Sequence, residues 1–407
     1  MIIPSIDIMN GKAVQLRGGR ELVITSERDP VDLAREFNRY GEVAVIDLNA
    51  ALGKGDNFDL ICKILRVCDA RVGGGIRDKK RAGELLRAGA ASIIIGTAAK
   101  EEFLKELPKD RVMVALDHKG GEVFDSGWTR STNEKVLDRA RLLAPSCSGF
   151  LITFVEDEGG MKGFNLDEAA RLKEEIPLPI TVAGGVANED DVINISRLGM
   201  DVQVGMALYT GNLEPVKAVV ESLDFQKSEF LPTIVQDQAG RVLMLAYSTR
   251  ESLAMALRDG KGIYYSRSRG KIWQKGETSG NIQELISCRT DCDRDTLLFI
   301  VKQTGNACHT ENYSCFGRKR FSLSDLYSVL NERKKTLPEG SYSAKLFRDR
   351  KYLLRKIMEE AYETTSAEGR RELVWELADA IFMLSALAVD EGISWKEIEA
   401  ELGGRSK

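Results

Sequence analysis

The chain has 407 residues, 43% of them hydrophobic and 29% charged, which suits roughly two to four folded domains. The formal net charge of −4 gives no broad positive field and argues against a nucleic-acid partner. No run approaches the roughly 18 uninterrupted apolar residues that cross a membrane, and the N-terminal MIIPSIDIMNGK indicates a first strand rather than a signal peptide.

Residues 1–222 alternate short β-branched runs with helical stretches such as 30–40 and 79–88. The strand-like runs lie at 1–8, 43–48, 71–72, 92–95, 112–116, 150–154, 180–182 and 202–204. Eight strands with helices between them predict a parallel (β/α)8 barrel. An open doubly wound sheet is the alternative.

An internal repeat favours the barrel. Val72-Gly73-Gly74-Gly75-Ile76 recurs as Val182-Ala183-Gly184-Gly185-Val186, 110 residues later, and Asp7 and Asp117 are separated by the same 110 residues. This pattern indicates a duplicated half-barrel, in which the two aspartates end equivalent strands.

Glycines follow the repeated strands, where backbone N–H groups can approach a phosphate closely. Two such cradles at equivalent positions predict a substrate with a phosphate at each end; plain tight turns are the alternative. The cradle residues are Gly73, Gly74, Gly75, Gly96 and Thr97 in one half, and Gly184, Gly185 and Gly205 in the other.

Asp7 and Asp117 would face each other across the barrel mouth between the cradles. A carboxyl pair can divide acid and base roles when the surroundings separate the two pKa values. Each aspartate could instead cap a helix or pair with a lysine. Thr153, at a neighbouring strand end, could hydrogen-bond a substrate hydroxyl.

The pattern of strand and helix signals changes after residue 222. Residues 223–230 are short and polar, as in a linker, and 231–317 are rich in strands and turns. Residues 318–407 carry amphipathic helical patterns with no strand signal. The expected order is therefore an α/β barrel, a small β-rich domain and an all-α domain.

Seven cysteines in a chain without an export signal favour a reducing compartment, and we expect the cytoplasm. Three of them are scattered among apolar residues as small hydrophobes. The other four crowd into 28 residues: Cys288, Cys292, Cys308 and Cys315.

Asp291, Asp293 and Asp295 alternate around Cys292, so on an extended segment the three carboxylates share one face and suit Mg²⁺. Cys292 would point the other way and, with Cys308 and Cys315, suit Zn²⁺ with a fourth position open to water. A solvated acidic turn with core cysteines, or a four-cysteine structural zinc site that includes Cys288, are the alternatives.

Five acidic residues fall on two helical patterns, Glu359, Glu360 and Glu363 on the first, and Glu376 and Asp379 on the second. Residues three and four apart share a helix face, so these acids can converge between packed helices. A solvated helix face is the usual alternative. Apolar residues interleave with the acids and argue against it: Leu353, Leu354, Ile357, Leu377, Ala380 and Ile381.

IPSIDIMNGKAV, VIDLNAALG, VGGGIRD, IIGTAA, ALDHKGGEVFDSGW, VAGGV and VGMALY resemble the phosphoribosylformimino-AICAR-phosphate isomerases of histidine biosynthesis, which perform an Amadori rearrangement. The resemblance implies that Asp7 is the general base, Asp117 the acid that opens the ribose, and Thr153 its assistant. Gln15 stands where the family usually has arginine, and Glu158 where it usually has aspartate.

Residues 231–317 resemble phosphoribosyl-AMP cyclohydrolase, through TIVQD, YYSRSR, WQKGETSGN and the cysteine and aspartate set. The resemblance implies zinc on Cys292, Cys308 and Cys315 from two subunits of a homodimer, and magnesium on Asp291, Asp293 and Asp295. His309 could relay protons or only support the site. Candidates for phosphate and ribose binding are Arg267, Arg269, Lys275, Thr278 and Ser279.

Residues 321–407 resemble phosphoribosyl-ATP pyrophosphohydrolase, through ERKKTLPEGSYSAKLF, LLRKIMEEAYE and ELADAIFMLSAL. The resemblance implies that Glu359, Glu360, Glu363, Glu376 and Asp379 hold Mg²⁺ on a triphosphate, and that Lys345 meets phosphate. Phe382 and Met383 replace the usual Tyr-His pair.

The three resemblances name consecutive steps on phosphoribosyl substrates: pyrophosphate removal, adenine ring opening and isomerisation. They predict a trifunctional enzyme of histidine biosynthesis. Two alternatives are a barrel that only serves as a scaffold, and a barrel that also isomerises phosphoribosylanthranilate.

Overall fold

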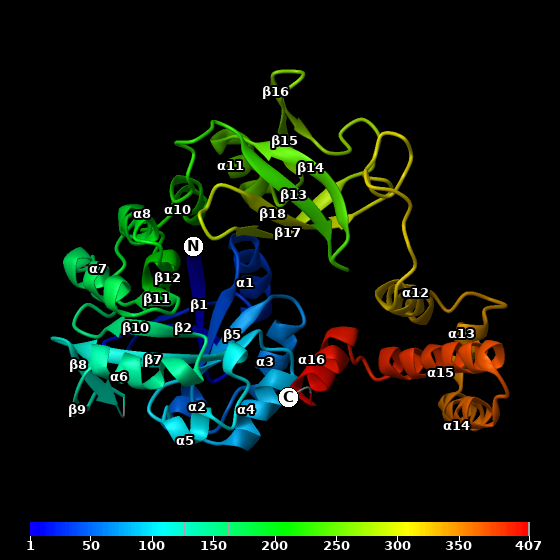
Figure 1. The fold of residues 1–407 in the computed structure, drawn as a ribbon, viewed down its shortest axis with the longest axis horizontal. Coiled ribbons are helices and arrows are strands. Elements are labelled where there is room, and N and C mark those ends of the chain that lie inside the picture. The colour runs from blue at the N-terminus through cyan, green and yellow to red at the C-terminus, as the bar shows by residue number, and fades with distance from the viewer. Residues whose placement is uncertain (126, 162, 406–407) are drawn as a thin grey trace. The chain divides into compact units, whose positions relative to one another are not determined.

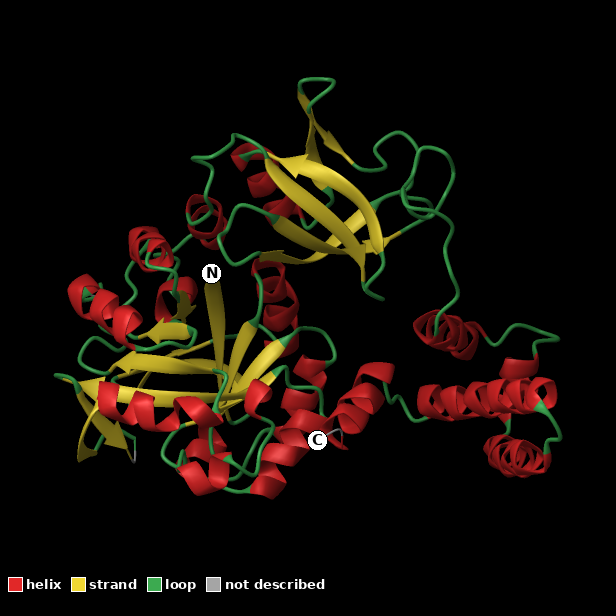
Figure 2. Ribbon diagram, viewed as in Figure 1, coloured by secondary structure: helices red, strands yellow, loops and turns green. Residues whose placement is uncertain are grey.

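The computed structural model describes residues 1–125, 127–161 and 163–405. They divide after Arg318 into two compact units, which are described separately. All described strands belong to the first unit, and the second is helical (Figure 2). Along the part of the chain that the structure describes, no helix is long and apolar enough to cross a membrane.

The N-terminal region is a closed barrel of eight parallel strands (Figure 1). Closure comes from the parallel pairing of β7 with β10, in which Thr153 lies beside Asp117. The eight strands are β1 (Ile2–Met9), β4 (Val43–Asp47), β5 (Ala70–Gly73), β6 (Ser92–Ile95), β7 (Val112–Lys119), β10 (Gly149–Phe154), β11 (Ile180–Ala183) and β12 (Asp201–Val204). The (β/α)8 prediction is confirmed, and the open doubly wound sheet is excluded because both edges pair.

Amphipathic helices cover the barrel. In α4 (Lys79–Arg87), Ala82, Leu85 and Leu86 are buried at helical spacing, and the side chain of Asp78 caps the first turn. The other helices are α1 (Pro30–Phe37), α2 (Leu48–Leu52), α3 (Phe58–Leu65), α5 (Glu101–Leu104), α6 (Val136–Leu143), α7 (Leu166–Glu175), α8 (Glu189–Arg197), α9 (Met206–Tyr209) and α10 (Pro215–Glu221).

Four strands fall in each half of the barrel, so the 110-residue repeat corresponds to two half-barrels. Asp7 lies on the first strand of one half and Asp117 on the first strand of the other. Arg71 and Thr181 are also 110 residues apart, and the guanidinium of Arg71 donates to the Thr181 hydroxyl at 2.8 Å inside the barrel. The two halves therefore meet through equivalent positions.

Two antiparallel hairpins extend strands of the barrel and were not predicted. β2 (Lys12–Arg17) and β3 (Glu21–Thr25) follow β1, while β8 (Glu122–Asp125) and β9 (Arg130–Lys135) follow β7. They occupy equivalent places in the two halves, each after a strand that carries a candidate catalytic aspartate.

The β-rich region is a four-stranded sheet with a separate hairpin. The sheet order is β14-β13-β18-β17, and β13 and β18 are parallel. Its strands are β13 (Leu231–Asp237), β14 (Val242–Ser248), β17 (Gln283–Thr290) and β18 (Leu297–Gln303), and the hairpin is β15 (Ile263–Ser266) and β16 (Lys271–Gln274). An unpredicted helix, α11 (Arg250–Asp259), begins at a capping box of Thr249 and Ser252 and ends at Gly260.

The β17–β18 hairpin docks on the N-terminal end of the barrel. The Asn38 side chain donates to the Ile286 carbonyl at 3.1 Å, and Arg289 forms an ion pair with Asp69. Arg294, in the turn between the strands, donates to the Met200 carbonyl at 2.9 Å. The barrel and the β-rich region consequently share one continuous apolar core.

The second unit consists of α12 (Leu323–Thr336), α13 (Tyr342–Arg348), α14 (Arg350–Ser366), α15 (Arg370–Asp390) and α16 (Trp395–Arg405). Its core is small, with Leu330, Leu346, Leu353, Met383 and Val389 among its buried members. Residues 406 and 407 of the predicted helical domain lie outside the described residues.

A β-bulge in β14, where the register with β13 shifts past Leu243, gives a stability prediction, because it puts two leucines two residues apart into different surroundings. Leu243 is fully buried, whereas Leu245 on the same strand is 53% exposed. We expect Leu243→Ala to lower the free energy of unfolding by about 2–5 kcal/mol, because it leaves a cavity in the core. Leu245→Ala is the matched control and should change it by less than about 0.5 kcal/mol in urea unfolding followed by circular dichroism. Equal losses in the two variants would contradict the burial of this strand.

Candidate active sites

The barrel mouth holds a cavity of about 690 Å³ at the C-terminal ends of the strands. The structure brings together there every barrel residue proposed from the sequence: Asp7, Asp117, Thr153, Gly73, Gly74, Gly75, Gly96, Thr97, Gly184, Gly185 and Gly205. Such placement follows from parallel closure, because all eight strands end on one side.

The two aspartates of the mouth are buried and differ in their surroundings. Ser5 donates to Asp7 at 2.7 Å, but burial dominates and raises the pKa of Asp7 to about 6. Burial also raises the pKa of Asp117, while hydrogen bonds from Thr153 and Trp128 act in the opposite direction. Two carboxyl groups with different partners can divide acid and base roles.

Glu158 is a third carboxyl group in this cavity. Burial and then the charges of Asp7 and Asp117 raise its pKa to about 8, so it is largely protonated at neutral pH. The sequence showed Glu158 only as a departure from a family pattern, because a loop residue has no periodicity that would predict its direction.

The side chains of Trp128 and Gln15 also line the mouth. Trp128 has φ of +67°, and its ring lies so close to Gly19 that a Cβ atom there would be 2.6 Å away. Gln15 is 4% exposed, and among the described residues its amide nitrogen has no hydrogen-bond partner. Both residues lie on or beside the unpredicted hairpins, so the sequence showed Gln15 only as a departure from a family pattern and Trp128 only as the end of a motif, without placing either in the cavity.

Backbone geometry explains four of the cradle glycines. Gly74, Gly75, Gly184 and Gly185 have positive φ, and an added Cβ would lie within 2.7 Å of backbone or side-chain atoms at each position. These turns therefore require glycine. Gly96 has neither feature, so its glycine leaves open space in the cavity instead.

Asp291, Asp293 and Asp295 lie in the turn 291–295, called the acidic turn below, between β17 and β18. Their carboxylate oxygens lie within 4.8 Å of one another, as a metal site requires. The extended segment expected from the alternation is wrong, because Arg294 has φ of +62° and reverses the chain. The ammonium of Lys227 lies 2.9 Å from Asp295 and 3.3 Å from Asp293, so the cluster accommodates a positive charge.

Two of the three candidate zinc thiols meet. Cys308 and Cys315 are joined by a hydrogen bond between their side chains, and a contact with Thr310 at 3.0 Å is the main cause that lowers the pKa of Cys308. Cys292 is exposed and joins no group of three possible ligands within 4.8 Å among the described residues. Cys288 is buried in β17, where burial raises its pKa to about 12.

The candidate substrate-binding residues of this region surround the β15–β16 hairpin. Arg267 stacks on Tyr247 at 3.6 Å from the ring centre, and Arg269 lies over Trp273. Lys275 is buried near Cys308 and Cys315, and burial lowers its pKa. The remaining candidates are exposed: Thr278, Ser279 and His309.

The helical unit gathers acids between α14 and α15. Glu360, Glu363 and Glu376 have carboxylate oxygens within 4.8 Å of one another. Desolvation and then the charges of Glu363 and Asp379 raise the pKa of Glu376. Glu359 lies beside this cluster, where it pairs with Lys356 at 2.8 Å.

The apolar residues between these acids differ from the expectation. Leu353 is buried, but Leu354, Leu377 and Ile381 are about two-fifths exposed. The acids therefore do not sit in a buried stripe of one chain; they border an apolar surface. Lys345 lies on the ring of Tyr352, Phe382 stacks on Tyr342, and Met383 is buried in the core of the unit.

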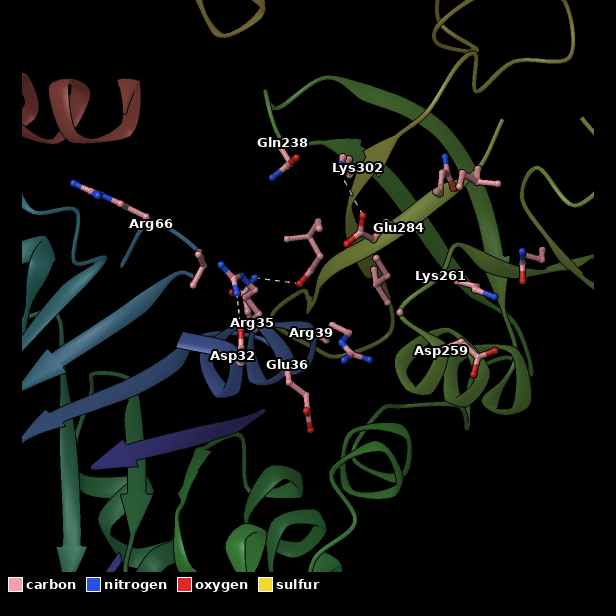
Figure 3. A pocket seen from close by; sticks show the side chains of 18 residues that line it. Asp32, Arg35, Glu36, Arg39, Arg66, Gln238, Asp259, Lys261, Glu284 and Lys302 are labelled. Atoms are coloured by element: carbon pink, nitrogen blue, oxygen red, sulfur yellow. Dashed lines mark hydrogen bonds and ion pairs between the residues drawn. The ribbon is translucent and has the colours of Figure 1, made fainter. Parts of the chain in front are cut away.

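A further cavity of about 850 Å³ lies between α1 and the β17–β18 hairpin (Figure 3). Its charged groups include pairs of opposite sign, such as Arg35 with Asp32 at 2.6 Å and Lys302 with Glu284 at 3.9 Å. Arg39 donates to the carbonyl of Leu257 at 3.1 Å. Of these contacts, only the bond from Arg39 joins the barrel to the β-rich region, and no clear excess of one charge marks the cavity as a binding site.

Three family models match the chain in order. Residues 1–214 match histidine biosynthesis protein, 244–317 match phosphoribosyl-AMP cyclohydrolase, and 323–406 match phosphoribosyl-ATP pyrophosphohydrolase.

Named relatives agree with these matches. The histidine biosynthesis bifunctional protein HisIE of Pyrococcus furiosus is 42% identical over 207 residues, which cover 47% of this chain and 99% of that protein. The histidine biosynthesis trifunctional proteins of Saccharomyces bayanus and Saccharomyces cerevisiae are 41% identical over 236 and 217 residues, or 57% and 53% of this chain. The chain spans 29% and 26% of the length of those two proteins. The chain thus belongs to the histidine biosynthesis protein family, and it carries a phosphoribosyl-AMP cyclohydrolase and a phosphoribosyl-ATP pyrophosphohydrolase domain behind the isomerase barrel.

Proposed function

We propose that the chain catalyses three steps of histidine biosynthesis: hydrolysis of phosphoribosyl-ATP to phosphoribosyl-AMP, opening of the adenine ring, and Amadori isomerisation of the resulting aminoaldose. The observation that carries the proposal is the order of three matched domains, each with clustered chemical groups. The products of the first two steps are the substrates of the next two, which a chance combination of domains would not give.

The barrel cavity supports the isomerisation. Asp7, with a pKa near 6, is ionised at neutral pH and can take the proton at C2. Asp117, with a raised pKa and hydrogen bonds from Thr153 and Trp128, would protonate the ribose ring oxygen. The two glycine cradles would hold the two phosphates on either side of this pair.

The β-rich domain supports the ring opening. The soft sulfur atoms of Cys308 and Cys315 suit Zn²⁺, and the hard oxygens of the acidic turn suit Mg²⁺. Zinc supplies a nucleophile by lowering the pKa of a water ligand toward neutrality. Lys275, next to both thiols, and the arginines of the β15–β16 hairpin would bind the phosphate of the substrate.

The helical unit supports pyrophosphate removal. Glu360, Glu363 and Glu376 converge as a hard-oxygen site for Mg²⁺ on a triphosphate. Lys356 bridges Glu359 and Glu360 at 2.8 Å and 3.0 Å and keeps both carboxylates in place.

We also propose a homodimer in the cytoplasm. Cys292 lies apart from Cys308 and Cys315, so a partner subunit would have to complete the three-thiol site. Exposed apolar residues on α14 and α15, among them Met358, Tyr362 and Trp375 at 69–75% exposure, suit contact with a partner. The seven free cysteines favour a reducing compartment.

Isomerase activity should depend on pH through Asp7. A general base must be ionised, so kcat/KM for the aminoaldose should rise as the pH increases through about 6. Ser5→Ala removes a hydrogen bond that favours the ionised carboxylate, so it should move this limb to higher pH by up to about one unit. Ser148→Ala, which removes a hydroxyl bonded to the Val112 carbonyl, is the control and should leave the limb in place.

A limb that does not move in Ser5→Ala would contradict the assignment of Asp7. Unchanged isomerase turnover in Asp7→Asn would favour the scaffold alternative for the barrel.

Subunit complementation tests the shared zinc site. Chains with Cys292→Ser or Cys308→Ser alone should lose ring opening, because every site then lacks one thiol. Random pairing of the two chains on co-expression should restore about a quarter of the wild-type sites, because half of the dimers hold one intact site. Phosphoribosyl-AMP consumption and bound zinc measure the recovery. No recovery would contradict a site shared between subunits, and zinc loss in Cys288→Ala would favour the four-cysteine site.

The first step should depend on the helical acids. With phosphoribosyl-ATP and Mg²⁺, Glu376→Gln should slow pyrophosphate release by roughly a hundredfold or more, because it removes a metal ligand. Glu332→Gln, on α12, is the control with the same charge change. Chromatography of the products in order tests the whole proposal, since the wild-type chain should accumulate neither phosphoribosyl-AMP nor the aminoaldose.

A further inference from the structure

The acidic turn is fastened to the barrel through Arg294. The guanidinium donates to the Met200 carbonyl at 2.9 Å and lies 3.9 Å from Asp201 on the barrel. The Arg294 carbonyl accepts from the backbone N–H of Asp224 at 2.9 Å, in the linker after α10. The turn and the linker are thus held against each other by contacts outside the carboxylates.

This arrangement places Lys227, three residues after Asp224, over the acidic turn. Its ammonium is 2.9 Å from Asp295 Oδ2 and 3.3 Å from Asp293 Oδ2. Asp291 has different partners, since its Oδ1 accepts hydrogen bonds from the backbone N–H groups of Asp295 and Thr296, each at 3.1 Å. Two of the three carboxylates therefore share one cation that comes from the linker.

We propose that Lys227 is an intramolecular counter-cation of the acidic turn, and that a divalent metal ion must displace it in order to bind. The inference rests on the proposed function, which assigns the turn as a metal site. An ammonium group held on these carboxylates repels a divalent ion that approaches the same oxygen atoms, so the two cations compete for the turn. Because the linker is fixed by Asp224, the ammonium stays close at a high effective concentration and weakens metal binding.

The counter-cation also stabilises the geometry of the turn when no metal ion is bound. Three carboxylates within 4.8 Å repel one another, and a nearby positive charge lets the turn keep its geometry before the metal arrives. Lys227 thereby sets the metal concentration at which the site fills.

Mn²⁺ binding to the zinc-loaded full-length chain tests this inference. A background with Glu363→Gln and Glu376→Gln silences the helical acid cluster, and electron paramagnetic resonance follows free Mn²⁺. Lys227→Met should bind Mn²⁺ about fivefold more tightly, the effect expected from losing two exposed ion pairs. The gain should shrink at high salt, and Lys227→Arg should stay near the wild-type affinity.

Lys302→Met removes the same charge from the neighbouring β-rich domain and is the control. Lys302 is paired with Glu284 at the far end of β18, seven residues beyond Asp295, and its loss should leave Mn²⁺ affinity unchanged. Unchanged or weaker binding in Lys227→Met, or an equal gain in Lys302→Met, would overturn the inference while the proposed function stands. If Asp293→Asn with Asp295→Asn removes no Mn²⁺ site, the metal assignment of the turn fails as well.

Discussion

Repulsion between carboxyl groups is the constraint on which all three sites depend, because each site gathers acids within reach of one another. In the barrel the repulsion is relieved by protonation, since burial and neighbouring charges raise the pKa of Glu158 to about 8. The acidic turn uses a lysine from the linker, and the helical cluster uses Lys356 from its own helix. The barrel cavity thus keeps a proton that acid and base chemistry can use. The acidic turn and the helical cluster keep charged oxygen atoms that a metal ion can bind.

The barrel could be predicted in detail because its signals are local and repeated. Strand limits such as 92–95 follow from runs of β-branched residues. Gly74 and Gly184 stand where only glycine tolerates the close approach of the Asp47 and Phe154 backbone, and the following glycines, 75 and 185, are as tightly packed. Asp7 and Asp117 could be paired in advance because the repeat fixes their symmetry. Parallel closure then brings every such residue to one end.

Other features depend on contacts distant in sequence and could not be predicted. Glu158 and Trp128 reach the cavity from loops, whose direction has no period. The alternation of Asp291, Asp293 and Asp295 suggested a strand, but the docking of Arg294 on the barrel bends that segment into a turn. The carboxylates still converge, because a tight turn also brings residues two apart together. The leucines of α14 and α15 have helical spacing whether a core or a partner covers them.

The docking of the β17–β18 hairpin affects how an intermediate could pass from the β-rich domain to the barrel cavity. The β-rich domain sits on the end of the barrel where the strands begin, while Asp7 and Asp117 lie where they end. The barrel interior between the two ends is filled with side chains. Among the described residues, the barrel interior therefore offers no tunnel from the β-rich domain to the cavity at the mouth. Under the proposed function, the ring-opened intermediate leaves the β-rich domain and enters the barrel from outside, and the fusion secures equal numbers of the two catalysts.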